Sequence, residues 1–380
     1  MRISVLLCIT LAALFGFYIE PLAQIHLHSD LYNYWLLTQQ FLKGISPYDF
    51  EQLTSVADYD VAPAHFGPWV FPILLLILSY SFKTSVFIYL AVMTLMTLLL
   101  SVLASRLFVT KKLSIDSACL SGLLFLPIIQ TFAYGQWSIL IAAFGYGALL
   151  AYRSERYFLC GALLAGATFK PHLCFLVWTA LLITVFHKRQ WQVLFGGIIT
   201  IGAFSAVAEL LVPGITLDWL TSVRSSMGWK SASIIMPIRL LFASPEDPYP
   251  ALPAIVIPLG LMWGVATFFS WNKERAFLSY LPHLLCLSCI TAPYIWPFDY
   301  TVLIGVHLAI LHDSSIKTPR SILPSSLLIL ANIGFAVHFF IQDEFQKLST
   351  FWFPIALLYL WVKVKNSSVA ATHQQNGCTQ

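Results

Sequence analysis

Residues 84–105 read TSVFIYLAVMTLMTLLLSVLAS, an apolar stretch without a single charged side chain. A helix needs about 20 such residues to cross a hydrocarbon core of roughly 30 Å. The whole chain of 380 residues is 58% hydrophobic and only 10% charged. Since soluble proteins usually carry about a quarter charged residues, this composition excludes soluble enzymes, secreted scaffolds and disordered regulators. The sequence therefore predicts an all-α, polytopic membrane protein.

Comparable apolar runs lie on both sides of this stretch and predict about twelve transmembrane helices. The predicted crossings are 3–19, 84–105, 113–131, 136–152, 156–169, 171–186, 191–212, 251–271, 276–292, 300–312, 322–340 and 348–362. The apolar stretch at 67–82 is interpreted as a re-entrant or partial span, because a thirteenth crossing would move the basic loop after it to the other side. We expect one integral membrane domain over residues 1–365 and a polar, disordered tail over 366–380.

Basic residues gather in the short connectors between these runs. They are Arg106, Lys111 and Lys112; Arg153 and Arg156; Lys188 and Arg189; Lys273 and Arg275; Lys317 and Arg320; and Lys363 and Lys365. Cytoplasmic loops are enriched in Lys and Arg, so both termini are predicted to be cytosolic and the protein to lie in the cell membrane. The opposite, extracytosolic face collects most of the unusual polar residues, and this convergence suggests a cavity open to the outside.

The first outer loop contains HSDLYNYWLLTQQFLKGISPYD, starting at His28. Its apolar residues recur at helical spacing, which predicts an interfacial helix with Asp30 as its cap and Gly44 at its end. Asp30 has a second interpretation, a catalytic carboxylate at the boundary between lipid and water. The patterns His26-x-His28-x-Asp30 and Asp58-x-Asp60 are compatible with a divalent metal, but neither spacing is specific, and we expect no cofactor.

Five short motifs follow one another along residues 25–310. They are Asp30 with Tyr32 or Tyr34 and Gly44-Ile45-Ser46-Pro47-Tyr48; Pro68-Trp69-Val70-Phe71-Pro72; Gly135-Gln136; Gly166-Ala167-Thr168-Phe169-Lys170-Pro171; and Thr291-Ala292-Pro293-Tyr294-Ile295-Trp296-Pro297-Phe298-Asp299. In this order they resemble glycosyltransferase family 87, membrane enzymes of the GT-C fold class that use polyprenyl-phosphate sugars as donors. The sequence departs from the family pattern at Ser138, where Asn is usual, and at Tyr300 and Thr301, where histidines often stand.

The resemblance implies transfer of a hexose, mannose-like, from a polyprenyl-phosphate donor to a glycan or glycolipid hydroxyl on the extracytosolic face. An acceptor hydroxyl needs a nearby base, and Asp30 is the candidate, with inversion at the anomeric carbon. Cationic groups would stabilise the departing phosphate, and the candidates are Lys170, Arg224, Lys230 and Arg239. Candidates for contact with the sugar or the acceptor are Tyr34, Gln136, His172, Trp296 and Asp299.

A purely structural role stays open for several of these residues. Lys170 is also compatible with a lysine that extends its ammonium to the membrane surface at a tight turn, although a polar site explains better why it interrupts an apolar run before a proline. Gln136 and Asp299 could pair with neighbouring helices, and His172 could simply pack. Cys286-x-x-Cys289 lies inside an apolar run and is interpreted as packing.

Two other functions fit a multispan chain of this kind. A transporter or flippase would carry polar groups near the middle of the membrane, whereas here they concentrate toward one end. An O-antigen polymerase or ligase would place its chemistry in the arginines of the loop 213–250 instead of at Asp30. The expected partners are a lipid-linked sugar, a glycan or glycolipid acceptor and the bilayer, with no nucleic acid.

Overall fold

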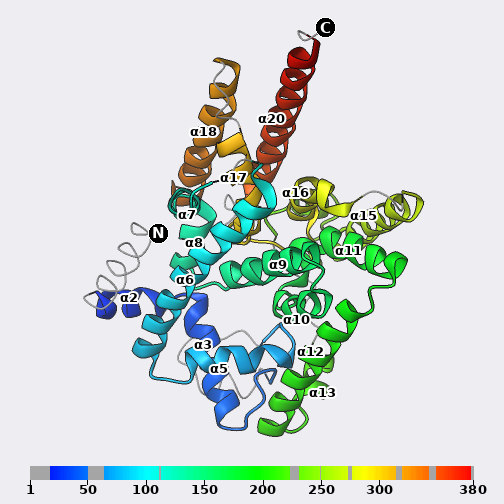
Figure 1. The fold of residues 1–380 in the computed structure, drawn as a ribbon. Helices are drawn as coiled ribbons and strands as arrows, with labels where there is room; N and C mark the ends of the chain where they lie inside the picture. Colours follow the sequence, from blue (N-terminus) through cyan, green and yellow to red (C-terminus); the bar gives the residue numbers. More distant parts are fainter. Residues whose placement is uncertain are drawn as a thin grey trace. The chain divides into compact units, whose positions relative to one another are not determined.

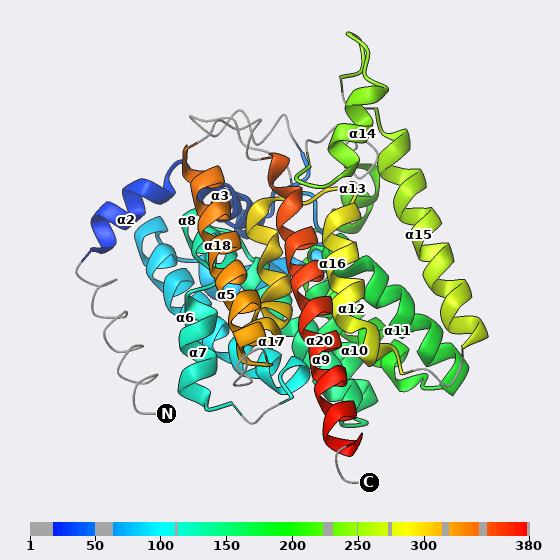
Figure 2. The same ribbon diagram turned by 90° about the horizontal axis from the view of Figure 1, so that it is seen from above.

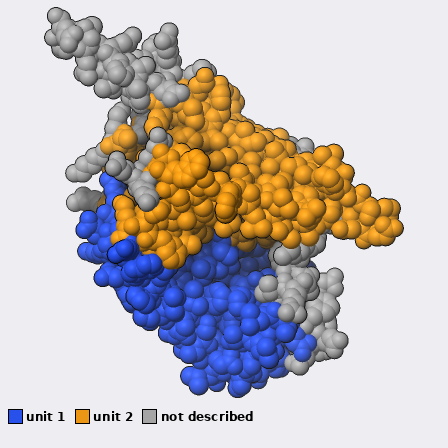
Figure 3. All heavy atoms as spheres, turned by 90° about the vertical axis from the view of Figure 1, so that its right-hand side faces the viewer, with its two compact units in different colours: residues 1–100, 129–171, 189–229 blue, residues 101–128, 172–188, 230–380 orange. Residues whose placement is uncertain are grey.

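The computed structural model describes residues 18–49, 64–110, 113–222, 231–248, 250–272, 276–313, 319–341 and 348–377. Within these ranges every regular element is a helix, which confirms the predicted all-α class (Figure 1). The chain forms two compact units. The first unit comprises residues 1–100, 129–171 and 189–229, and the second comprises 101–128, 172–188 and 230–380 (Figure 3). Each unit is assembled from separate stretches of sequence, and the single domain predicted over 1–365 stays a prediction.

The helices agree closely with the apolar runs. They are α2 (Ile19–His26), α3 (Asp30–Leu42), η1 (Pro68–Val70), α5 (Phe71–Leu78), α6 (Phe82–Phe108), α7 (Ile115–Leu123), α8 (Leu126–Ala133), α9 (Ser138–Arg153), α10 (Tyr157–Ala167), η2 (Pro171–Cys174), α11 (Phe175–Lys188), α12 (Gln192–Leu211), α13 (Ile215–Ser222), α14 (Ile235–Leu241), α15 (Leu252–Trp271), η4 (Phe277–Tyr280), α16 (Leu281–Thr291), η5 (Pro297–Leu303), α17 (Ile304–Asp313), α18 (Pro319–Ile341), η6 (Leu348–Phe351) and α20 (Trp352–Gly377). The last helix continues into the residues predicted to form a disordered tail. The first predicted crossing, 3–19, lies almost entirely outside the described residues.

Four helical segments in the described part of the chain are long and apolar enough to cross a membrane. They are 82–108, 171–188, 192–211 and 252–271, and a fifth span results if α7 and α8, which meet at a bend of 61°, count as one. Shorter apolar helices account for most of the other predicted crossings. The helices therefore support a membrane protein, while the number of about twelve crossings and the GT-C architecture stay predictions.

Prolines explain why several apolar runs do not form one continuous α-helix. Pro68, Pro171 and Pro297 each open a short 3-10 segment that leads into the following α-helix. Proline lacks a backbone N–H and is tolerated in the first turn of a helix, where that N–H has no partner within the helix. The proposed partial span at 67–82 has this form, a 3-10 turn followed by the short helix α5, which ends at Leu78.

The predicted helix of the first outer loop is present as α3, and it packs against α5. Its Phe41 ring stacks on Phe71, with centroids 4.6 Å apart. The Gln39 amide donates to the Leu78 carbonyl at 2.8 Å, at the C-terminal end of α5. Gly44 follows the helix with φ of 75°, so it ends α3 as predicted. These contacts fix the orientation of α3 within the first unit.

Helices α10 and α12 run side by side in the first unit, and glycines allow their backbones to touch (Figure 1). A Cβ atom added to Gly161 would lie 1.8 Å from the Val193 carbonyl oxygen and 2.7 Å from the Gly197 nitrogen. Gly196 is equally restricted, since its Cβ would lie 2.1 Å from the Phe158 carbonyl oxygen. Small residues at such crossings replace side-chain contacts by direct backbone packing, as is common between membrane helices.

We expect Gly161→Ala to destabilise the first unit by about 1–3 kcal/mol or more, because overpacking forces the helices apart. Thermal unfolding of the purified protein in detergent measures the effect. Gly202→Ala in α12 is the matched control, since nothing lies within 4 Å of its added Cβ and alanine favours helices. Equal unfolding temperatures for the two variants would contradict the proposed backbone contact.

The second unit contains an aromatic core. Phe335 of α18 and Phe353 of α20 lie with ring centroids 4.4 Å apart, and Tyr300 of η5 stacks on Phe353 at 6.1 Å. All three side chains are fully buried. Around this core, α16 and α20 lie side by side (Figure 2). The core fixes the position of η5, whose first residues are the end of the motif 291–299.

Candidate functional site

Asp30 is the first residue of α3, and Ser29 caps the helix in its place. The Ser29 hydroxyl oxygen accepts the Leu31 N–H at 3.3 Å, so the prediction that Asp30 is the cap was wrong. A serine in extended conformation just before the helix is a favoured cap, and the sequence offers Ser29 and Asp30 side by side. The Asp30 carboxylate instead accepts a hydrogen bond from the Gln136 Nε2 amide at 2.5 Å.

The Gly135-Gln136 turn brings Gln136 to α3. Gly135 has φ of 65°, and a Cβ at this position would lie 2.4 Å from the Leu31 Cβ and 2.7 Å from the Leu31 nitrogen. Only glycine meets both requirements without strain. The Tyr89 hydroxyl of α6 also donates to the Gln136 carbonyl at 2.8 Å. The turn therefore packs against the start of α3 through Gly135 and is hydrogen-bonded to α6 through Tyr89.

Lys170 completes a chain of polar contacts within the first unit. It follows α10, and its Nζ ammonium donates to the Gln136 Oε1 at 2.9 Å. Two residues earlier, the Thr168 hydroxyl accepts the Trp69 indole N–H at 2.9 Å. Three predicted site residues from distant motifs, Asp30, Gln136 and Lys170, are thus joined by hydrogen bonds. This arrangement brings a carboxylate and a cation together, joined by one amide.

Aromatic rings adjoin this polar chain. Tyr34 meets Trp137 edge-on at 6.0 Å and lies 6.0 Å from Phe169, while Phe66 contacts Phe169 at 4.7 Å. Tyr34 belongs to α3, Trp137 and Phe169 directly follow or precede a polar residue of the chain, and Phe66 packs on Phe169. We call Tyr34, Phe66, Trp137 and Phe169 the aromatic wall. Phe66, Trp137 and Phe169 are buried, whereas Tyr34, the predicted contact residue, is half-buried and is the ring of this group that is accessible to a sugar.

His26 contributes to the site through the start of α3. Its ring is buried, and burial lowers the pKa of His26 to about 4, so the ring is neutral near pH 7. Its Nδ1 lies 3.0 Å from the Ser29 hydroxyl oxygen, and its ring packs edge-on against Tyr89 at 6.2 Å. Through these contacts His26 stabilises the first turn of α3. Among the described residues no group of three or more His, Cys, Asp or Glu could hold a metal, and Asp58 and Asp60 lie outside them.

The remaining predicted residues of the described chain lie in the second unit. Trp296 donates its indole N–H to the Tyr294 hydroxyl at 2.6 Å, and the His172 ring meets the Tyr294 ring edge-on at 5.5 Å. His172, Tyr294 and Trp296 are half-buried. The structure thus groups two predicted residues around Tyr294, which the prediction omitted although it lies inside the quoted 291–299 motif.

Asp299 and Arg239 are deeply buried in the second unit. Asp299 accepts the Trp296 backbone N–H at 3.1 Å and belongs to the cap of η5. Arg239, in α14, is only 1% exposed. The other two basic candidates, Arg224 and Lys230, lie outside the described residues. Asp299 therefore has a local structural role at the start of its own helix, and both its pairing with a neighbouring helix and its contact with sugar stay predictions.

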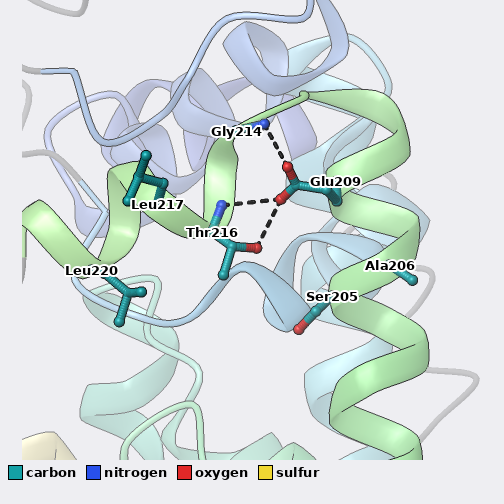
Figure 4. Close-up of a pocket in the computed structure, with 7 residues that line it drawn as sticks. All are labelled: Ser205, Ala206, Glu209, Gly214, Thr216, Leu217 and Leu220. Atoms are coloured by element: carbon teal, nitrogen blue, oxygen red, sulfur yellow. Dashed lines mark hydrogen bonds between the residues drawn. The ribbon is translucent and has the colours of Figure 1, made fainter.

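A cavity of about 490 Å³ lies elsewhere in the first unit, at the corner between α12 and α13 (Figure 4). Glu209 closes this corner by accepting hydrogen bonds from the Gly214 nitrogen at 2.5 Å and the Thr216 hydroxyl at 2.8 Å. The lining is mostly apolar and includes Leu217 and Leu220. Asp30, Gln136 and Lys170 do not line it. The cavity is therefore separate from the polar chain described above.

The described part of the chain has helices as its regular elements, with four or five possible membrane spans. Its candidate site is a carboxylate, an amide and a lysine joined by hydrogen bonds. These features define a helical membrane protein with a candidate polar site. The sequence model of glycosyltransferase family 87 matches residues 66–293, more than half of the chain. The chain belongs to this family and is a glycosyltransferase, which acts on a sugar donor and an acceptor. No curated protein and no solved structure matches it. The match includes Gln136 and Lys170, while Asp30 precedes it.

Proposed function

We propose that the protein transfers a mannose-like hexose from a polyprenyl-phosphate donor to a hydroxyl of a glycan or glycolipid. The reaction takes place on the extracytosolic face of the cell membrane. The observation that carries this proposal is the hydrogen-bonded chain Asp30–Gln136–Lys170, which brings a proton acceptor near a phosphate-binding cation. Membership of the family supports sugar transfer, and the apolar helices support a lipid-linked donor that reaches the site from the bilayer.

In the proposed step, the acceptor oxygen forms a bond to the anomeric carbon while the bond from that carbon to the phosphate oxygen breaks. Asp30 takes the acceptor proton, and the polyprenyl phosphate leaves with the electron pair. Attack opposite the leaving group inverts the anomeric centre. The negative charge that develops on the phosphate is stabilised by Lys170, a half-buried cation that its hydrogen bond to Gln136 holds in place.

The sugar ring would lie between these two groups. The aromatic wall, through Tyr34, offers a surface for the apolar face of the ring on the first unit. His172, Trp296 and Asp299, which belong to the second unit, stay sequence-based candidates for contact with the sugar or the acceptor. Arg239, Arg224 and Lys230 remain proposed phosphate ligands. These assignments specify side chains whose replacement should affect substrate binding.

A donor comparison tests the proposed reaction. The purified full chain in proteoliposomes is supplied with polyprenyl-phosphate mannose, polyprenyl-phosphate glucose or the matching nucleotide sugars, together with a glycolipid extract. We expect mass spectrometry to detect a hexose added to the glycolipid with the lipid-linked donors only. Transfer from nucleotide sugars would overturn the proposed donor class. Polymerisation of a lipid-linked glycan, or movement of lipid without transfer, would favour a polymerase or a transporter instead.

We expect Lys170→Met to lower kcat/KM for the donor by about 10²–10³-fold, because it removes the charge that stabilises the departing phosphate. Lys170→Arg should restore part of the rate. Initial rates at varied donor concentration measure both effects. Lys83→Met is the matched control, since Lys83 is an exposed lysine of the first unit that pairs with Glu20. Equal rates for Lys170→Met and Lys83→Met would contradict the assignment.

A further inference from the structure

Gln136 lies between two groups that impose opposite demands on its amide. The Lys170 ammonium can only donate hydrogen bonds, and the Asp30 carboxylate, when ionised, can only accept them. The observed contacts satisfy both, with Oε1 toward Lys170 at 2.9 Å and Nε2 toward Asp30 at 2.5 Å. Turning the amide over would place oxygen against oxygen and donor against donor. The two charged groups therefore select one orientation of this side chain.

The main chain of Gln136 is held as firmly as its side chain. Its backbone N–H donates to the Thr131 carbonyl at 3.0 Å, and its carbonyl accepts the Tyr89 hydroxyl at 2.8 Å. The residue is only 5% exposed. A side chain anchored at both ends and excluded from water presents its N–H group to Asp30 in a fixed direction. Hydrogen bonds to charged groups are stronger than neutral ones.

We propose that Gln136 is a positioning residue: its amide holds Asp30 in its ionised form and in a fixed orientation, while its oxygen holds the Lys170 ammonium. This inference rests on the proposed function for the meaning of Asp30 and Lys170. It assigns Gln136 to the alignment of the base with the cation, a different role from the sugar contact that its motif suggested. Because one amide binds both side chains, a displacement of Asp30 or of Lys170 is passed to the other through Gln136.

Two substitutions separate the two ends of the amide. Gln136→Glu keeps the size of the side chain and an acceptor for Lys170, but it loses the donor to Asp30 and places a second carboxylate beside it. Gln136→Leu loses both contacts. Two neighbouring carboxylates resist joint ionisation, so the Asp30 carboxylate should become protonated at a higher pH in the Glu variant than in the wild type. Gln136→Leu should raise the pH at which Asp30 becomes protonated by a smaller amount, because it removes the donor without adding a charge.

The first measurement is the pH dependence of sugar transfer by the full chain in proteoliposomes. For Gln136→Glu we expect the acid limb of the kcat profile to move to higher pH by about 1 unit or more. We also expect kcat at neutral pH to fall about 10–100-fold, and KM for the donor to rise, because the new carboxylate pairs with the Lys170 ammonium in place of the donor phosphate. Gln136→Leu should raise KM for the donor as well, because it loses the contact that holds Lys170.

Gln130→Leu is the matched control. Gln130 lies six positions earlier and is equally buried, but both of its side-chain amide atoms lack a hydrogen-bond partner within the described structure. We expect its pH profile to equal that of the wild type. A purely structural role for Gln136 predicts that Gln136→Leu, which removes the amide without adding a charge, keeps the wild-type profile, and this result would overturn the proposal.

A second measurement does not depend on catalysis. Infrared difference spectra between acidic and neutral pH detect the protonated carboxylic acid, and the band that disappears in Asp30→Asn belongs to Asp30. We expect this band to appear at higher pH in Gln136→Glu and Gln136→Leu than in the wild type or in Gln130→Leu. An unchanged titration refutes the inference even if transfer is detected. A shifted titration in a protein without transferase activity retains the role of Gln136 and rejects the proposed function alone.

Discussion

Replacing Asp30 by Asn is expected to reduce sugar transfer by about 10²–10⁴-fold, the range over which a positioned base accelerates proton transfer. An amide cannot take the proton of the acceptor hydroxyl. The substitution keeps the size of the side chain, so the fold of the first unit should survive. Initial rates of hexose transfer from a polyprenyl-phosphate donor, measured in proteoliposomes, give the effect.

The control for this experiment is Asp247→Asn, which changes an exposed carboxylate of the second unit. It should transfer sugar at the wild-type rate. Asp30→Asn should still bind the donor, because Lys170 is unchanged. If Asp30→Asn retained more than about a tenth of the wild-type rate at all pH values, Asp30 would not be the base. Loss of transfer only after replacement of Arg224 or Arg239 would then favour the polymerase or ligase.

The second large effect is expected from Gly135→Ala. A left-handed backbone conformation costs a non-glycine residue about 1–2 kcal/mol, and the added Cβ would lie 2.7 Å from the Leu31 nitrogen. Because this nitrogen follows Asp30 directly, relief of the clash must move the base away from Gln136. We expect both a lower unfolding temperature and a loss of transfer of about 100-fold or more, since small misplacements of reacting groups reduce rates strongly.

Gly44→Ala distinguishes the effect of backbone strain at a positive φ from the effect of a steric clash of the added Cβ. Gly44 also has a positive φ, 75°, but nothing lies within 4 Å of its added Cβ. This variant should lose stability to a similar extent from backbone strain alone while it keeps its transfer rate. Thermal unfolding and initial rates on the same two preparations provide the comparison. Equal transfer by the two variants would show that the close approach of Gly135 to Leu31 does not control the site.

The helices could be predicted because their signal is local. A run such as 192–211 is mostly apolar, and hydrophobicity over about 20 residues is enough to identify it. The end of α3 at Gly44 was equally readable from the chemistry of glycine. The cap of α3 was not, since Ser29 and Asp30 are both good caps and adjacent. In the structure Ser29 is the cap, and the Asp30 carboxylate instead accepts a hydrogen bond from Gln136, more than a hundred residues away.

The candidate site was predictable as a set of residues but not as an arrangement. Asp30, Gln136 and Lys170 were selected from separate motifs, and each also had a structural interpretation. Tyr89 was not selected, because a tyrosine inside the apolar run of α6 looks like ordinary packing, although its hydroxyl holds the Gln136 backbone. Tyr294 was omitted for a similar reason, since its neighbour Trp296 dominates the motif.

The sequence by itself determined that the protein is helical, that it is rich in membrane-type segments and that it belongs with glycosyltransferases, because these properties depend on composition, periodicity and the order of short motifs. Only the tertiary structure decided that the amide of Gln136 joins Asp30 to Lys170 and that Gly135 must approach Leu31. Hydrogen bonds act over about 3 Å, so residues far apart in the chain acquire a common chemistry only when packing brings them together.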